Sequence, residues 1–427
     1  MIKIDKIELN NFRFFTDNKA NNSFMPKGKN LLIYGENGSG KSSIFRALEL
    51  LAQTKIEKEI FLKSKNIFSK QDPSLIFELD NQEKIIIDIE HLENSYDYIK
   101  ALAIYRPMLE YKNLLKIHYQ TDKTKEEINI YDMLRELFRE YPLDNRLLGD
   151  IKNPDIYFTT LRDILNSKVL NDINDFLAKF DNNFHVSKFF FDKEFTEDGK
   201  VEFIINVKID FMNNSLDVYN HFLNEARLSA LAIAINFAII RNVSDKLQDS
   251  SLKLLILDDL LISLDMSNRL SLIAILKEYF RDFQIFLFTH DKGFFEILKD
   301  KMNWKSYEIY VHRDEFGREV PYIKEALDYF QSAKKYFDEY DYPACANYLR
   351  KEVERLKKIK ERQEQSLYNE NEIFKKLKKM LIQFDLTDEL KSGEIRGKLI
   401  GFEFGKGLQE AIRIIDKIRR SLKEDKK

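Results

Sequence analysis

The pattern of hydrophobic and polar positions changes character along the chain. Apolar residues alternate with polar ones in Ile2–Leu9, Ser74–Leu79 and Lys84–Ile89, as they do in half-buried strands. Two short, continuous apolar runs, Lys253–Leu257 and Gln284–Phe288, are typical of strands buried on both faces of a parallel sheet. The pattern therefore predicts a β-rich N-terminal region and a buried parallel sheet later in the chain.

Helical spacing separates and follows these strands. Apolar residues recur every three or four positions from about Ala101 to Leu170, in Leu216–Arg241, in Met266–Phe280 and from Val320 onward. Strand-like alternation returns in between, in Phe184–Phe191 and Val201–Phe211. Together these segments predict an α/β fold with a short helical insertion and an all-helical C-terminal domain.

A phosphate-binding motif follows the apolar run Asn30–Tyr34. Residues 35–42 read G-x-x-x-x-G-K-S, and a helical pattern begins directly after them, which is the strand–loop–helix context that a P-loop needs. We expect Lys41 to reach the β and γ phosphates of ATP and the Ser42 hydroxyl to hold Mg²⁺. The residues expected around the phosphates are Asn37, Gly38, Ser39, Gly40, Lys41, Ser42 and Ser43.

Composition narrows the classes of protein that fit. A chain of 427 residues is long enough for two or three lobes. Its 69 basic and 71 acidic residues give no global field for a polyanion, although a local basic patch stays open. The single cysteine, Cys345, excludes an internal disulfide. We see no apolar run of about 18 residues and no signal peptide, and we expect a cytoplasmic protein without a membrane partner.

Acidic and imidazole side chains follow the two buried strands. Asp258 ends the first, where a carboxylate can hold Mg²⁺ beside Ser42. Asp259 comes next, at the position of a general base or a water-orienting group. His290 follows the second strand, at the edge where α/β sheets bind ligands, and is a candidate sensor of the γ-phosphate. The alternatives are an acidic turn and a structural histidine.

The order of these motifs resembles the ABC-type ATPase head of the SMC, Rad-type, RecN and RecF proteins. The resemblance covers about residues 1–60 and 200–312. It implies the following matches: Asp258 and Asp259 with the Walker B pair, Ser263-Leu264-Asp265 with the D-loop, His290 with the switch histidine, Arg13 with a nucleotide-contacting basic residue, and Leu223–Leu231 with the signature sequence.

Two departures from that family affect the expected activity. Asp259 stands where the family usually has Glu, so we expect hydrolysis to be slow or to need an activator. Asn224 stands where Ser is usual, although its amide can still donate to a γ-phosphate. Glu225 and Ala226 replace two glycines and limit close backbone approach. The alternative is that this segment is only the start of a core helix.

The resemblance also implies partners. The family's signature closes on the nucleotide of a second subunit, so we expect a homodimer, with larger rings of dimers as an alternative. The variant signature resembles RecF-like ATPases of bacterial anti-phage systems, including relatives of the Septu and PARIS ATPase subunits. This implies a sensor or regulatory subunit that controls a separate effector, a nuclease or toxin, with nucleic acid as a candidate ligand.

The domain organisation follows from the same patterns. We expect a discontinuous head of residues 1–110 and 200–312, a helical insertion of 111–199 and a helical domain of 325–427. The insertion lacks sustained heptads, which favours a compact lobe over a long coiled-coil arm. Tyr105–Lys112 is a candidate lid or interface.

The helical tail carries one further candidate site. Arg350 and Glu354 share a helix face and resemble the HEPN-type ribonuclease end of PrrC and RloC, but no histidine follows Glu354 to act as acid or base. A surface ion pair is the alternative. For the whole chain, the alternatives to a regulatory ATPase are a RecF-like DNA repair ATPase, a PrrC-like ATP-gated ribonuclease and a nucleotide-locked structural clamp.

Overall fold

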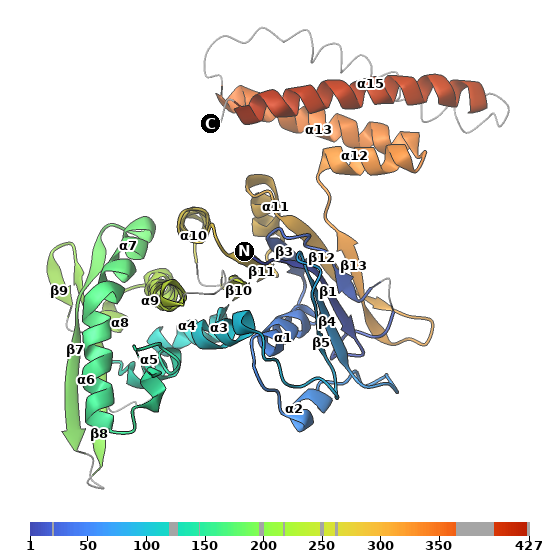
Figure 1. The fold of residues 1–427 in the computed structure, drawn as a ribbon. Coiled ribbons are helices and arrows are strands. Elements are labelled where there is room, and N and C mark those ends of the chain that lie inside the picture. The colour runs from blue at the N-terminus through green and yellow to red at the C-terminus, as the bar shows by residue number, and fades with distance from the viewer. Residues whose placement is uncertain are drawn as a thin grey trace. The chain divides into compact units, whose positions relative to one another are not determined.

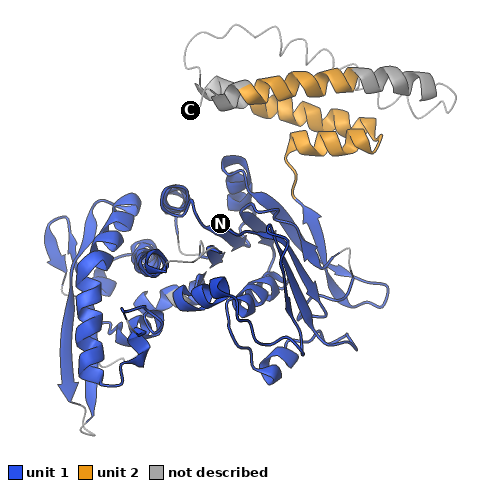
Figure 2. Cartoon of the chain, viewed as in Figure 1, with its two compact units in different colours: residues 1–325 blue, residues 326–427 orange. Residues whose placement is uncertain are grey.

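The computed structural model describes residues 1–18, 21–118, 127–144, 146–195, 200–216, 218–247, 252–260, 264–363 and 397–424. It divides into two compact units, Met1–Glu325 and Ala326–Lys427 (Figure 2). The first unit contains helices and three sheets, and the elements described in the second are all helices. The predicted α/β fold class with an all-helical C-terminal part is therefore confirmed.

A six-stranded sheet forms the centre of the first unit, in the order β13-β12-β3-β11-β10-β6 (Figure 1). Its strands are β3 (Leu31–Gly35), β6 (Met108–Glu110), β10 (Leu254–Asp258), β11 (Gln284–Thr289), β12 (Lys305–Arg313) and β13 (Glu319–Glu325). All neighbours pair in parallel except β13, which is antiparallel to β12. Every residue of β3 and β11 is buried, which explains why both read as continuous apolar runs. The carboxyl ends of β3, β11, β10 and β6 consequently share one edge.

A second, antiparallel sheet is formed mainly by the N-terminal strands, in the order β2-β1-β4-β5. Its members are β2 (Ser23–Phe24), β1 (Ile4–Asn10), β4 (Ser74–Leu79) and β5 (Lys84–Ile87). Buried and less buried residues alternate along β4 and β5, which confirms the half-buried strands predicted there. Helices α1 (Lys41–Leu51) and α2 (Lys58–Leu62) lie between β3 and β4 in sequence, and α1 contacts both β3 and β10.

The predicted insertion, residues 111–199, and the segments on either side of it combine helices with a long hairpin. Apart from β6, the elements of this region are α3 (Asp97–Tyr105), α4 (Tyr111–His118), α5 (Tyr131–Leu137), a 3-10 turn (Leu148–Asp150), α6 (Pro154–Ile164), a π-helical turn (Leu165–Val169), α7 (Leu170–Phe180), β7 (Phe184–Phe195), β8 (Val201–Phe211) and β9 (Asn214–Leu216). Helix α6 begins at Pro154 because the Asn153 side chain accepts two backbone N–H bonds and proline needs none. The hairpin β7–β8 confirms the strands predicted in this region.

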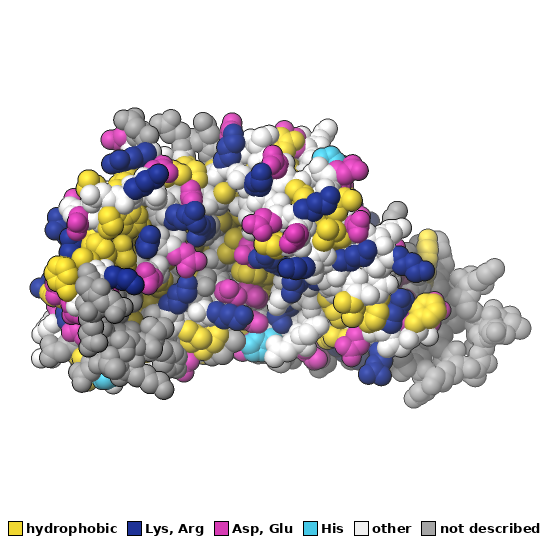
Figure 3. All heavy atoms as spheres, turned by 90° about the horizontal axis from the view of Figure 1, so that it is seen from below, with side chains coloured by type: hydrophobic (Ala, Val, Ile, Leu, Met, Phe, Trp, Pro, Cys, Tyr) yellow, Lys and Arg dark blue, Asp and Glu magenta, His cyan; other side chains and the backbone are white. Residues whose placement is uncertain are grey.

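Four helices connect the remaining strands of the first unit: α8 (Tyr219–Phe222), α9 (Glu225–Lys246), α10 (Met266–Tyr279) and α11 (Lys292–Lys301). Helix α9 is long and apolar enough to cross a membrane, but 83% of its apolar window is buried inside the protein. Its apolar side chains are therefore those of a helix packed in the core. Surface charge is mixed, and Figure 3 shows Lys and Arg side chains interspersed with Asp and Glu over the face drawn there.

Two predictions are wrong in this unit. The helix predicted from Val320 onward is a strand up to Glu325, because β13 extends the central sheet along β12. Pro321 is compatible with that strand because β13 lies at the sheet edge. The lid interpretation of Tyr105–Lys112 fails for Met108–Glu110, which pair with Ile256–Asp258 as strand β6.

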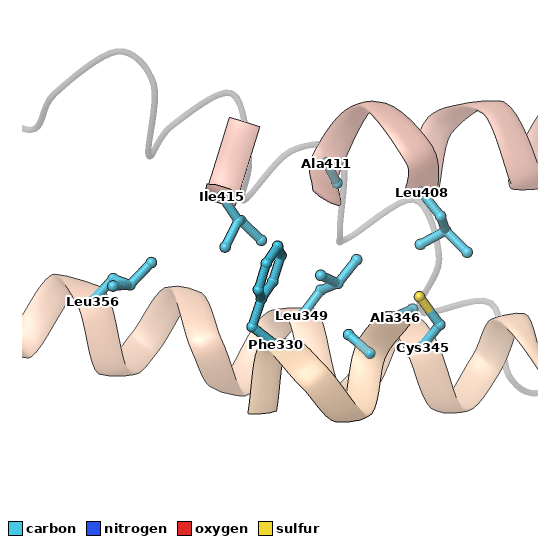
Figure 4. Close-up of a cluster of buried hydrophobic side chains, with 9 residues drawn as sticks. Phe330, Cys345, Ala346, Leu349, Leu356, Leu408, Ala411 and Ile415 are labelled. Atoms are coloured by element: carbon cyan, nitrogen blue, oxygen red, sulfur yellow. The ribbon is translucent and has the colours of Figure 1, made fainter. Parts of the chain in front are cut away.

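The second unit contains α12 (Tyr329–Asp338), α13 (Tyr342–Gln363) and α15 (Gly397–Glu424). Its core joins all three helices (Figure 4), and the buried members are Phe330, Ala333, Cys345, Ala346, Leu349, Leu356, Leu408, Ala411 and Ile415. Asp328 and Gln331 cap the first turn of α12 reciprocally. The three helices therefore form a small core of their own.

Candidate functional site

The loop between β3 and α1 has the backbone that its glycines permit. Gly38 and Gly40 have φ angles of 84° and 106°, in the left-handed region that disfavours other residues. A Cβ at Gly40 would lie 2.9 Å from the Phe14 ring. The Ser39 hydroxyl is buried and has no hydrogen-bond partner among the described residues. The backbone at Gly40 is thus tightly packed, and the buried Ser39 hydroxyl lacks a hydrogen-bond partner among the described residues.

Lys41 is the first residue of α1, and its side chain folds back onto this loop. Its ammonium donates to the carbonyl oxygens of Gly35 at 2.6 Å and Glu36 at 3.2 Å. It lies 4.0 Å from Oδ2 of Asp259. Burial lowers the pKa of Lys41, and the carboxylates of Asp259 and Asp258 oppose this shift. The side chain is therefore held at the mouth of the loop by groups that a phosphate can replace.

Asp258 ends β10 and carries a buried, unsatisfied oxygen. Its Oδ1 has no hydrogen-bond partner among the described residues. Burial raises the pKa of Asp258 to about 7, the nearby Asp259 and Glu110 carboxylates add to the shift, and Lys41 opposes it. A buried carboxyl oxygen without a donor fits a cation at this position better than an isolated charge.

Glu110 is a member of this site that the sequence analysis missed. It ends β6 and is the register partner of Asp258 across the parallel pair β6–β10. The strand has only three residues, which is too short for a periodic pattern to reveal. Its one sequence signal is an acidic residue directly after the apolar Met108-Leu109 step.

Asp259 and His290 meet at the ends of adjacent strands. Oδ1 of Asp259 lies 2.8 Å from Nδ1 of His290 and accepts the backbone N–H of His290 at 3.0 Å. The backbone N–H of Asp259 donates to the carbonyl of Phe288 on β11. Asp259 has a φ angle of 50°, a left-handed conformation that Asp tolerates better than most residues. The structure thus brings Lys41, Asp258, Asp259 and His290 together.

The residues present fit Mg²⁺ held by a nucleotide. Among the described residues, no three or more His, Cys, Asp or Glu side chains are grouped to hold a metal ion. Mg²⁺ does not require such a group, since it binds one or two carboxylates together with phosphate oxygens and water. The exposed Ser42 and the unsatisfied Oδ1 of Asp258 supply protein ligands of that kind.

The remaining residues predicted at the P-loop differ in exposure. Asn37 is exposed in the loop, and the mostly buried Ser43 accepts the backbone N–H of Phe14 at 3.5 Å. Arg13 is exposed in the turn after β1, where its φ angle is 52° and its backbone N–H donates to Ser64. The turn that carries Arg13 therefore packs beside the start of α1.

Asn224 of the predicted signature and Asp265 of the predicted D-loop are exposed at helix N-termini. Asn224 caps α9 by accepting the N–H of Arg227, and Asp265 caps α10 by accepting the N–H of Asn268. Within the described part of the chain, no hydrogen bond or ion pair joins Asn224 or Asp265 to the P-loop. Ser263 of the predicted D-loop lies outside the described residues.

The candidate pair in the tail does not form a buried site. Glu354 is exposed on α13. Its neighbour Glu352 is 0% exposed and accepts two bonds of 2.8 Å from Arg355, while Arg419 lies at 3.2 Å. The carboxylate held by arginines in this unit is therefore Glu352, which the sequence analysis did not single out.

One known protein family has a model that matches the P-loop region. Residues 31–152 match the family described as "AAA domain, putative AbiEii toxin, Type IV TA system". The match covers the P-loop, α1, β6 and the start of the insertion. No curated protein matches the chain in sequence.

Distant structural likenesses cover most of the chain. The Smc head of Pyrococcus furiosus bound to the C-terminal domain of ScpA is 12% identical with a TM-score of 0.47, over 79% of this chain and 99% of that one. The SMC head of Thermotoga maritima is 13% identical with a TM-score of 0.40, over 76% and 99%. RecF bound to ATP is 15% identical with a TM-score of 0.40, over 75% and 98%.

Proposed function

We propose that this chain binds ATP with Mg²⁺ and hydrolyses it slowly. The observation that carries the proposal is the meeting of Lys41, Asp258, Asp259 and His290 at the carboxyl ends of β3, β10 and β11. A phosphate chain would take the place of the Gly35 and Glu36 carbonyls as the partner of Lys41. Asp258 and Ser42 would hold the metal ion, which neutralises the phosphate charge when bound.

Asp259 and His290 are proposed to act on the attacking water and the γ-phosphate. The Asp259 carboxylate would orient the water or accept its proton. Its side chain is short, and one oxygen already accepts two bonds from His290. Only Oδ2 is then left for the water and for Lys41, which accounts for a slow reaction.

The proposed working form is a homodimer that forms around ATP. Asn224 and Asp265 support it, because both are exposed at helix N-termini, where backbone N–H groups favour anions. Residues that lack a contact with their own P-loop are available to the nucleotide of a second copy. Hydrolysis would remove the γ-phosphate contacts that hold the pair together.

We further propose that this dimer is a cytoplasmic regulatory subunit of a defence system that controls a separate effector. The match to a domain described as a putative toxin of a type IV TA system favours a toxin-linked role over repair. Nucleic acid is a candidate signal. A neighbouring gene for a nuclease or toxin would support this role, and neighbouring recombination genes would support the RecF-like repair alternative.

One experiment tests the proposal. The wild-type chain, Lys41→Ala and Asp259→Asn are compared for ATP turnover, for molar mass by light scattering with ATP·Mg²⁺, and for cleavage of plasmid DNA and total tRNA. We expect slow turnover by the wild type alone, an ATP-dependent dimer of Asp259→Asn, and intact nucleic acids. Turnover equal to that of Lys41→Ala would refute the ATPase. Cleavage lost in Lys41→Ala would show that the chain is itself the effector.

A further inference from the structure

A cavity that no P-loop residue lines lies among α5, the start of α6 and β8. It has a volume of about 830 Å³ and is open to solvent on one side. That volume is in the range of small-molecule sites, roughly 300–1,000 Å³. None of the residues assigned above to ATP or Mg²⁺ lines it. The cavity is therefore a candidate binding site for a ligand other than the ATP of the P-loop.

Three cations line one part of this cavity: Arg135, Arg139 and Lys152. Arg135 reaches the cavity from α5, and Arg139 reaches it from the turn that follows this helix. Among the described residues, the Arg135 guanidinium has no hydrogen bond or ion pair, and Arg139 is 68% exposed with only a 3.5 Å contact to Glu140. Two such guanidinium groups can bind a phosphate through paired hydrogen bonds.

The same cavity offers acceptors and an apolar surface. The carboxylate of Asp132 is exposed one turn before Arg135 and Glu136 on α5. Phe203 of β8 is half-buried, packs on the rings of Tyr131 and Phe158, and lines the cavity with the rest of its side chain. Hydroxyl and amino groups donate to carboxylates, and a flat base packs on an aromatic surface. A ligand that uses all three features carries a phosphate, hydrogen-bond donors and a ring.

We propose that this cavity binds a mononucleotide, with Arg135, Arg139 and Lys152 on the phosphate and with Asp132 and Phe203 on the nucleoside. The site is separate from the P-loop and does not depend on the proposed ATPase. Tyr157 fixes its wall, because its hydroxyl donates to the Arg135 carbonyl. A site for a second, non-hydrolysed nucleotide would make the insertion a sensor lobe.

Contacts across α5 connect this cavity to the ATP site. Glu136 lines it and also lines a second cavity of about 620 Å³ on the other side of α5. Its carboxylate pairs with Lys116 at 2.9 Å, and its backbone carbonyl accepts Arg106 at 3.2 Å. The second cavity extends to Glu110, the neighbour of Asp258. A ligand that shifts α5 would consequently move the strand beside the metal-binding carboxylate.

Binding is tested apart from hydrolysis. The full chain carrying Lys41→Ala is titrated with AMP, GMP, CMP, UMP and pyrophosphate by calorimetry, and circular dichroism confirms that each variant is folded. We expect at least one mononucleotide to bind, and Arg135→Gln with Arg139→Gln to weaken it about tenfold or more. Arg162→Gln, an exposed arginine of α6 outside the cavity, is the matched control. Asp132→Asn should weaken the mononucleotide and leave pyrophosphate unchanged.

Two kinds of result would overturn this proposal, and a third would overturn only the proposed ATPase. Binding of no mononucleotide, or binding that is the same in the double arginine variant and in Arg162→Gln, removes the site. Pyrophosphate that binds as tightly as every mononucleotide reduces it to an anion site and refutes the nucleotide. If ATP turnover fails in the wild type while the mononucleotide still binds, only the proposed ATPase is wrong.

Discussion

Asp259 and His290 are joined by two contacts to a single oxygen. Oδ1 of Asp259 accepts the backbone N–H of His290 at 3.0 Å and lies 2.8 Å from its Nδ1. A carboxylate oxygen only accepts, so Nδ1 carries the proton in this pair and Nε2 is left for another partner. The two side chains therefore form one unit, fixed at the ends of β10 and β11.

This unit predicts that the two residues contribute to turnover together. Asp259→Asn and His290→Ala should each lower kcat about 100-fold while the Kd for ATP changes little, since the P-loop backbone, Lys41 and the metal ion would make most of the phosphate contacts. The double variant should be no slower than the worse single variant. Steady-state ATP hydrolysis and nucleotide titration measure both constants, and His312→Ala, at the exposed end of β12, is the control. Additive losses would show that the residues act independently.

The glycines of the P-loop predict a graded loss of stability. Gly40→Ala should destabilise the chain by about 2 kcal/mol or more, because it combines a strained φ of 106° with a Cβ 2.9 Å from the Phe14 ring. Gly38→Ala meets open space and should cost only the strain of its positive φ, about 1 kcal/mol. Thermal unfolding of the two variants makes the comparison. Equal losses would mean that Phe14 moves aside without cost.

Parts of the site that are contiguous in the chain were predictable from sequence. The P-loop needs its residues within eight positions, and Asp258, Asp259 and His290 directly follow buried strands whose apolar runs are visible. Glu110 was not predictable, because its place beside Asp258 comes from the pairing of β6 with β10, two strands far apart in sequence. Strand β13 was missed because a half-exposed edge strand with Pro321 has little periodic signal. In the tail, which of Glu352 and Glu354 is buried depends on how α13 packs on α15.

Asp258, a half-buried residue with one fully buried oxygen, predicts a conflict between stability and function. The ordinary pKa of 3.8 applies to the unfolded chain, and burial raises the pKa of the folded carboxyl to about 7. Between these values the folded chain binds a proton that the unfolded chain lacks, so the free energy of unfolding falls as pH rises from about 4 to 7. At pH 8, without nucleotide and Mg²⁺, Asp258→Asn should therefore stabilise the chain by about 2–4 kcal/mol while abolishing turnover.

The effect of Asp258→Asn can be controlled by changing the pH. At pH 4 the wild-type carboxyl is protonated and resembles the amide, so the gain from Asp258→Asn should vanish. Thermal midpoints of the two chains, measured from pH 4 to pH 8, follow this difference. Asp163→Asn, at an exposed position of α6, should give no pH-dependent difference. A gain that is constant with pH would show that the carboxyl ionises normally in the folded chain.

Arg419 predicts how the helical unit is held together. Its guanidinium donates to Asp328 at 2.7 and 3.2 Å and lies 3.2 Å from the fully buried Glu352. These contacts join α15 to the first turn of α12 and to α13. Among the described residues, Arg419→Ala would leave Glu352 with Arg355 alone, and removal of one partner from a buried ionic group is expected to destabilise this unit by about 3 kcal/mol.

The adjacent Arg420 is the matched control, since it lies on the same helix and carries the same charge but is far more exposed. Its contact is an exposed i,i+4 pair with Asp416, which is worth roughly 0.5 kcal/mol or less. Urea unfolding is monitored by the helical circular dichroism signal. The unfolding transition of the helical unit should be lost in Arg419→Ala and retained in Arg420→Ala. ATP turnover should be the same in both, because residues 1–325 carry the whole proposed site. Equal stability of the two variants would show that Arg355 alone compensates the charge of Glu352, and that Arg419 is not needed to join the helices.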